Sequence, residues 1–97
     1  MFKTLTLSDF SSTVGSSFQV CPEPDTSLQL ELLEAVELSS SSSARSESFS
    51  LLFKGPSDVV LPQKLYSMNH SDLGDLSIFL VPVAGASDGI RYEAIFN

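Results

Sequence analysis

The chain has 97 residues, of which 42% are hydrophobic and 18% charged, a composition typical of one compact domain with its own core. Its single cysteine, Cys21, excludes an internal disulfide, and with the single histidine, His70, it excludes the Cys/His zinc patterns. The net charge of −7 disfavours nucleic acid and anionic lipid as partners. We therefore expect no structural metal, no cofactor and no nucleic-acid partner.

Membrane insertion is not expected either. The N-terminal residues lack the apolar stretch of a signal peptide, and the longest apolar run, from Ile78 to Ala84, is short and broken by Pro82. Secretion by that route is not supported, and the sequence leaves open whether the protein stays in the cytoplasm or leaves as part of an assembly.

The N-terminal part is predicted to form one short helix. Residues 7–14 can make one or two turns, with Thr6 or Ser8 as the N-terminal cap. Such a helix turns Leu7 and Phe10 toward the core.

The next strands are separated by prolines. Residues 17–20 are predicted to form a strand and residues 22–25 a loop, because Pro22 and Pro24 remove backbone donors and fix φ. Residues 27–38 are rich in Leu and Glu, but the strand period separates apolar from polar side chains better than the helical period does. We expect a strand here, with a helix as the minority alternative. The apolar face of this strand would hold Leu28, Leu30, Leu32, Glu34, Val36 and Leu38.

A serine-rich segment, residues 39–47, is predicted to be a surface loop. After it, Phe49, Leu51 and Phe53 alternate with less apolar residues, which is the clearest strand signal in the chain. The proline-bounded connection at 56–62 is expected to lie across an open end of the core.

The last third of the chain has the pattern of two hairpins. Tyr66 and Met68 share one face of the first strand, and short Ser/Asp/Gly segments mark the turns. The expected strands are 65–70, 75–83 and 90–97, with turns at 71–74 and 85–89.

These elements predict a mainly β fold. About six strands separated by Gly, Pro and Ser turns, with one short N-terminal helix and no second long helix, indicate a small antiparallel barrel or sandwich. We expect a single domain over residues 1–97.

Two catalytic patterns occur without the context that catalysis needs. Gly85 to Gly89 matches the G-x-S-x-G nucleophile elbow around Ser87, but a strand and not a helix is predicted after it, and the only histidine precedes it. The neighbours His70, Ser71 and Asp72 have the residue types of a serine-hydrolase triad, but sequence neighbours rarely converge on one reacting atom. We expect a hairpin loop and a turn, and no catalytic residues.

The carboxylates Glu31, Glu34 and Glu37 would share one side of a helix, as an acid/base or metal cluster requires. In the predicted strand Glu34 points opposite to the other two, so a solvated acidic face is expected and no metal site. Cys21 has no basic neighbour in sequence, so nothing indicates a reactive thiol.

The second half of strand 75–83 is apolar on both faces, whereas one core covers only one of them. The favoured expectation is that the helix at 7–14 packs outside this strand with Phe10. The alternative is an interface for a protein partner, either a fibre-type subunit or a second copy of the chain. Under that alternative, the partner-binding residues are Phe79, Val81, Val83 and Ile95.

Several strand and turn motifs resemble those of a small bacterial family of unknown function. They are the string from Phe49 to Pro56, the Leu61-Pro62-Gln63 turn leading to Tyr66, and the tail from Tyr92 to Asn97. The resemblance spans nearly the whole chain except the serine run. It implies no catalytic residues, and it implies that members are encoded beside proteins similar to phage tail-collar or fibre proteins. The leading expectation is therefore a noncatalytic component, adaptor or assembly helper of such a fibre, and the alternative is a small acidic binding module for a soluble ligand or protein.

Overall fold

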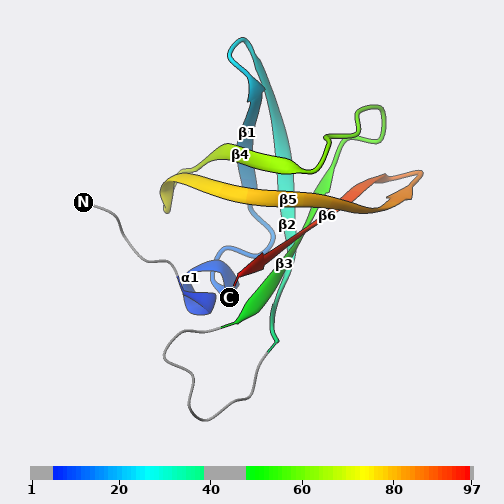
Figure 1. The fold of residues 1–97 in the computed structure, drawn as a ribbon. Coiled ribbons are helices and arrows are strands. Elements are labelled where there is room, and N and C mark those ends of the chain that lie inside the picture. The colour runs from blue at the N-terminus through cyan, green and yellow to red at the C-terminus, as the bar shows by residue number, and fades with distance from the viewer. Residues whose placement is uncertain (1–5, 39–47, 97) are drawn as a thin grey trace.

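Six strands close into an antiparallel barrel in the part of the chain that the computed structural model describes, residues 6–38 and 48–96 (Figure 1). Around the barrel the neighbours follow the order β1-β2-β3-β6-β5-β4. The predicted mainly β fold with one short N-terminal helix is confirmed, and of the two architectures the barrel is the one formed. The elements are α1 (Leu7–Ser11), β1 (Ser17–Glu23), β2 (Thr26–Glu37), β3 (Phe49–Gly55), β4 (Lys64–His70), β5 (Gly74–Ala86) and β6 (Gly89–Phe96). The predicted serine-rich loop, residues 39–47, lies outside the described residues.

The barrel consists of two antiparallel meanders, β1-β2-β3 and β4-β5-β6. They are joined at both sides by pairs of corresponding strands, because β1 pairs with β4 and β3 pairs with β6. The central strand of each meander is the long one, with 12 residues in β2 and 13 in β5, and each carries a bulge. The two halves therefore share one plan.

The core fills the inside of this barrel. Strand β3 alternates buried and half-buried residues, as its sequence predicts, and it pairs with β6 so that Phe53 lies opposite the buried Tyr92. Alternation places every second side chain of each strand inside, where its apolar surface leaves water. The buried apolar residues are Phe10, Phe18, Val20, Leu30, Leu32, Phe49, Leu51, Phe53, Leu61, Tyr66, Met68, Ile78, Leu80, Tyr92 and Ala94.

The helix seals one end of the barrel and does not cover the outside of β5. Thr6 caps it, and Thr6 and Asp9 form a reciprocal capping box. Phe10 is fully buried, with its ring centroid 5.8 Å from Phe49 and 5.5 Å from Phe96, and the helix packs against β2. The expectation that Phe10 packs outside β5 is therefore wrong, and α1 ends sooner than predicted.

Strand β1 continues through Pro22, contrary to the predicted loop at residues 22–25. Its pairing with β4 ends at Cys21, which lies opposite Ser67. Pro22 is thus beyond the last β4 partner, where a missing N–H breaks no ladder bond on that side, so a strand tolerates it. The hairpin turn is confined to Pro24 and Asp25.

A bulge reverses the two faces of β2. The register slips between Leu32 and Glu34, so the predicted inner face holds only as far as Leu32. Beyond the bulge, Ala35 lies opposite the buried Leu51, and Glu34 and Val36 are exposed. The strand prediction for this segment is confirmed, the helical alternative is wrong, and the assignment of faces after Leu32 is corrected.

The connection at residues 56–63 closes the other end. Leu61 is buried, and its backbone N–H donates to the Tyr92 hydroxyl at 2.8 Å. The same hydroxyl donates to the Val59 carbonyl at 3.4 Å. Tyr92 of β6 thus holds the connection over this end of the barrel, which is where the sequence predicts the connection to lie.

Candidate functional site

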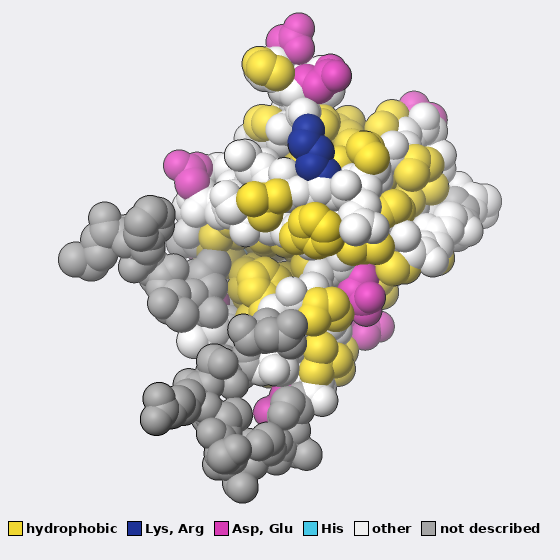
Figure 2. Space-filling view, viewed as in Figure 1, with side chains coloured by type: hydrophobic (Ala, Val, Ile, Leu, Met, Phe, Trp, Pro, Cys, Tyr) yellow, Lys and Arg dark blue, Asp and Glu magenta, His cyan; other side chains and the backbone are white. Residues whose placement is uncertain are grey.

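An apolar patch lies on the outer surface of the second meander. Leu65 of β4 lies directly opposite Phe79 of β5, and both point outward because their sequence neighbours Tyr66, Ile78 and Leu80 are buried. The two side chains are 58% and 47% exposed. Figure 2 shows hydrophobic side chains gathered along β5 on this face. We call this set, completed by the half-buried Val81 and the exposed Val83 and Ile95, the outer patch.

The outer patch has charged residues at its border. A cross-strand row on the outside of the barrel runs from Glu34 through Leu52 and Glu93 to Val81. Directly opposite residues in antiparallel strands have side chains on the same face, so both carboxylates stand beside the apolar surface. Cations also border the patch, because the exposed Lys64 directly precedes Leu65 and Arg91 lies opposite Ala84, next to Val83. A protein that docks here therefore meets apolar side chains bordered by charges of both signs.

Strand β5 also has a free edge beside the outer patch. Its pairing with β4 ends where Leu80 meets Lys64, whereas its pairing with β6 continues to Ala86. The edge from Val81 onward therefore has no partner on the β4 side among the described strands. Pro82 and the bulge between Pro82 and Ala84 interrupt this edge, which limits how long a pairing strand can be.

His70 is buried and acts as a structural link. Its Nδ1 accepts hydrogen bonds from the backbone N–H groups of Asp72 at 3.0 Å and Leu73 at 3.3 Å. Because Nδ1 is an acceptor, the proton lies on Nε2, which is 2.8 Å from the Ser16 Oγ and donates to it. The Ser16 hydroxyl in turn donates to the Thr13 carbonyl. Both ring nitrogens are occupied, so His70 ties the β4–β5 turn to the segment after α1, as the predicted turn requires.

The other catalytic pattern forms a hairpin. Ser87 and Asp88 make the turn between β5 and β6, so a strand follows the G-x-S-x-G sequence, as predicted. Arg91 donates hydrogen bonds to the Asp88 carboxylate at 3.3 and 3.4 Å, and these bonds hold the pKa of Asp88 below its usual value. His70 lies at the opposite end of β5, so Ser87 and His70 are separated by the length of that strand.

The three carboxylates of β2 do not form a cluster. Because of the bulge, Glu31 and Glu34 lie on the outer face, whereas Glu37 lies opposite the buried Phe49, so the prediction that Glu34 is the odd member is wrong. Glu31 is 3.9 Å from Lys54 on β3. Within residues 6–38 and 48–96, no group of three His, Cys, Asp or Glu side chains could hold a metal ion. Cys21 is exposed, with its thiol free.

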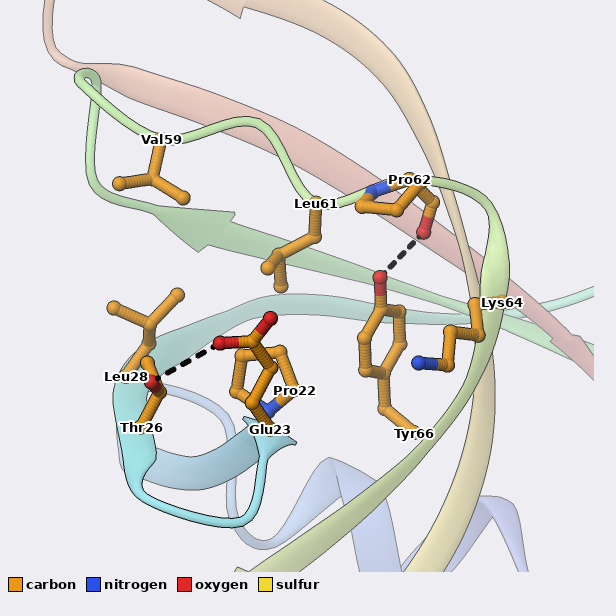
Figure 3. Close-up of a pocket in the computed structure, with 9 residues that line it drawn as sticks. All are labelled: Pro22, Glu23, Thr26, Leu28, Val59, Leu61, Pro62, Lys64 and Tyr66. Carbon is orange, nitrogen blue, oxygen red and sulfur yellow. Dashed lines mark hydrogen bonds between the residues drawn. The ribbon is translucent and has the colours of Figure 1, made fainter.

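A cavity of about 330 Å³ was not predicted from the sequence. It lies between the β1–β2 hairpin and the connection that closes the barrel (Figure 3). Tyr66 forms part of its wall, donates from its hydroxyl to the Pro62 carbonyl at 2.6 Å, and has its pKa raised by burial and then by the nearby Tyr92. The lining residues are Pro22, Glu23, Thr26, Leu28, Val59, Leu61, Pro62, Lys64 and Tyr66.

Comparison with known families matches residues 5–96 to the Domain of unknown function (DUF6916). The chain belongs to this family. No curated protein and no solved structure matches the chain. The DUF6916 match extends over both meanders and α1, and it confirms the expected resemblance to a family of unknown function. No helix among the described residues of this DUF6916 chain is long and apolar enough to cross a membrane.

Proposed function

We propose that the protein is a noncatalytic structural or assembly protein, a component, adaptor or helper, for a fibre of the phage tail-collar type. It binds a subunit of that fibre through the outer patch. The observation that supports this is the exposure of Leu65 and Phe79 as a cross-strand pair on the outside of the barrel. Contiguous exposed apolar side chains of this kind mark interaction sites, because a soluble domain gains nothing from leaving them in water.

The net charge of the chain favours a different protein over a second copy as the partner. Two copies of a chain with a net charge of −7 repel one another. A fibre subunit with an apolar centre and a net positive charge matches both the outer patch and the charge of the chain. We therefore assign the outer patch to such a subunit.

The structural roles of His70 and Ser87, the two candidate catalytic residues, support the noncatalytic part of the proposal. His70 has both ring nitrogens engaged in structural hydrogen bonds. Ser87 lies in a hairpin turn at the far end of β5 from His70, so the histidine cannot take the serine proton. Replacing Ser87 with Ala is expected to remove no hydrolase turnover from the pure protein in an esterase assay.

The test uses a purified fibre protein of the phage tail-collar type from the same organism as the partner. Phe79→Asp places a charge at the centre of the outer patch, where association would bury it unpaired. We expect the parent to form a complex in size-exclusion chromatography with light scattering, and the variant to remain folded by circular dichroism and lose the complex. Val81→Asp should behave in the same way. Ser77→Asp, two residues before Phe79 and on the same outer face, should bind as the parent does.

Two outcomes would overturn this assignment. One is that the parent forms no complex with the fibre-type protein at micromolar concentrations. The other is that Phe79→Asp binds as tightly as Ser77→Asp. A parent that self-associates, and loses self-association on Phe79→Asp, would replace the fibre subunit with a second copy as the occupant.

A second candidate function, a small acidic binding module for a soluble ligand, is favoured by the cavity beside Tyr66. The cavity is formed by three separate parts of the chain, and it lies on the inner side of β4, away from the outer patch. The two functions therefore use different surfaces and can be tested separately.

A further inference from the structure

The cavity at this end of the barrel is a half-open pocket that combines apolar walls with a size suited to one small ligand. Pro22 and Leu28 supply one wall, Leu61 the wall facing them, and the ring of the buried Tyr66 the side (Figure 3). Its volume of about 330 Å³ is at the lower end of the range for small-molecule sites. An aliphatic chain or a single aromatic ring fits such a space.

Two side chains of opposite charge border the cavity. Glu23 reaches it from the end of β1 and Lys64 from the start of β4, and Figure 3 shows their charged groups on either side of Tyr66. The Lys64 ammonium lies 5.6 Å from the centre of the Tyr66 ring. Within the described parts of the chain, neither Glu23 nor Lys64 forms an ion pair. Glu23 accepts one hydrogen bond, from the Thr26 hydroxyl at 3.5 Å, which leaves its charge without a cationic partner among the described residues.

We propose that this cavity binds a small zwitterionic molecule with an apolar side chain, that is, a hydrophobic or aromatic α-amino acid. Its carboxylate pairs with Lys64, its ammonium group pairs with Glu23, and its side chain packs between Leu28 and Leu61. This inference deepens the second candidate function, the binding module, and does not depend on a fibre partner.

The pair of opposite charges selects against simpler ligands. A plain carboxylate with the same apolar group pairs with Lys64 but brings its negative charge toward Glu23. A plain amine pairs with Glu23 but approaches Lys64. Only a molecule that carries both charges satisfies both side chains.

Three probes with one aromatic ring test this selection: L-phenylalanine, 3-phenylpropionate and phenethylamine. Binding is measured by isothermal titration calorimetry and by amide shifts in two-dimensional NMR spectra of the full chain. We expect L-phenylalanine to bind about tenfold more tightly than either of the others, since each of them lacks one charge-assisted hydrogen bond. The largest amide shifts should occur in residues 22–28 and 59–66.

Two substitutions of exposed side chains separate the contribution of Glu23 to ligand binding from that of Lys64. Glu23→Gln should weaken L-phenylalanine binding by about tenfold and leave 3-phenylpropionate binding unchanged or stronger. Lys64→Gln should weaken binding of both carboxylates and spare phenethylamine. Because both residues are exposed, neither change should lower the unfolding midpoint.

The outcomes distinguish failure of this proposal from failure of the fibre proposal. Phe79→Asp should bind L-phenylalanine as the parent does, and Lys64→Gln should bind the fibre subunit as the parent does. Equal affinity for all three probes, or no shift in residues 22–28 and 59–66 at about 20 mM L-phenylalanine, a concentration at which even a millimolar Kd gives near saturation, would overturn the amino-acid site and leave the outer patch unaffected.

Discussion

The two meanders share a strand plan but differ on the outside of the barrel. On the first meander, the outer positions of the β1–β2 pair are polar, with Gln19 opposite Gln29 and Ser17 opposite Glu31. On the second, Leu65 lies opposite Phe79 at one end of the β4–β5 pair. Inside the barrel the buried strand residues of both meanders are apolar, with His70 of β4 as the polar exception.

This difference separates what the fold requires from what it leaves free. Each meander must present apolar side chains inward, because the core depends on that burial. In the first meander the outward pairs Ser17–Glu31 and Gln19–Gln29 are polar, although Val36 and Leu52 also face outward. The apolar outer pair of the second meander is thus not needed to form the barrel, and this is the strongest physical reason to assign it to a partner.

The largest expected effect compares an inward with an outward phenylalanine. Phe53→Ala removes a fully buried ring that packs edge-on against Phe18 at 5.4 Å, and it should lower the free energy of unfolding by about 3–5 kcal/mol. Phe79→Ala, at a position 47% exposed, should change it by no more than about 0.5 kcal/mol. Urea unfolding measures both. Similar losses for the two variants would show that Phe79 supports the fold, and the argument from the outer faces would fail.

A smaller effect on the free energy of unfolding is expected from substitutions in the turns, and it differs between the two meanders. The β4–β5 turn depends on the buried His70, whereas the β1–β2 turn at Pro24 and Asp25 is exposed. His70→Leu leaves the backbone N–H groups of Asp72 and Leu73 without this acceptor and should cost about 1–3 kcal/mol. Thermal unfolding is the measurement, with Asp25→Ala as the control of little effect. His70→Asn offers a side-chain oxygen in place of Nδ1 and should recover part of the lost stability. A His70→Leu variant as stable as the parent would contradict the role of His70 as the acceptor in this turn.

The smallest expected effect is a sensitivity to alkaline pH that belongs to the second meander, which contains both tyrosines. Burial raises the pKa of Tyr66 above its usual value of 10.0. The unfolded chain therefore loses this proton before the folded protein does, so stability is full below about pH 10 and falls as the pH rises toward the folded pKa. Urea midpoints measured from pH 8.5 to 11 should fall less steeply for Tyr66→Phe than for the parent. An equal slope would mean that Tyr66 is not the group responsible.

Most of the strands could be predicted because alternation is a local property. In β3 and β6 most inward positions carry large apolar side chains, with Gly55 and Ala94 as the small ones, and no bulge interrupts the register between the two strands. The bulge in β2 left a trace in the sequence, since Leu33 and Glu34 both break the alternation. Two residues that break the apolar/polar alternation do not by themselves distinguish a bulge from a regular strand with two exceptions. The faces of β2 beyond Leu32 were therefore assigned incorrectly.

The position of α1 and the cavity could not be predicted, because both depend on contacts between distant segments. A short helix with two large apolar residues, Leu7 and Phe10, can pack on any exposed apolar surface. Only the structure shows that this surface is the end of the barrel and not the outside of β5. The cavity brings Pro22 together with Leu61 and Lys64. No local pattern in the sequence relates these residues. Four patch residues, Phe79, Val81, Val83 and Ile95, could be named from the sequence, because an apolar strand face that the core cannot cover is visible in the sequence itself. Leu65 was missed, since only the pairing of β4 with β5 places it opposite Phe79.

The closure of the barrel has a consequence for the order of folding. Phe49 pairs with Phe96 and Gln19 with Asn69, so both closing contacts join segments far apart in the chain. Each hairpin can form locally, but the first meander cannot complete its sheet until β6 has been synthesised. Barrels dominated by such distant pairings fold in roughly milliseconds to seconds. During that interval the chain has unpaired strand edges beside an apolar stripe on β5, so misassembly with other chains competes most strongly before closure.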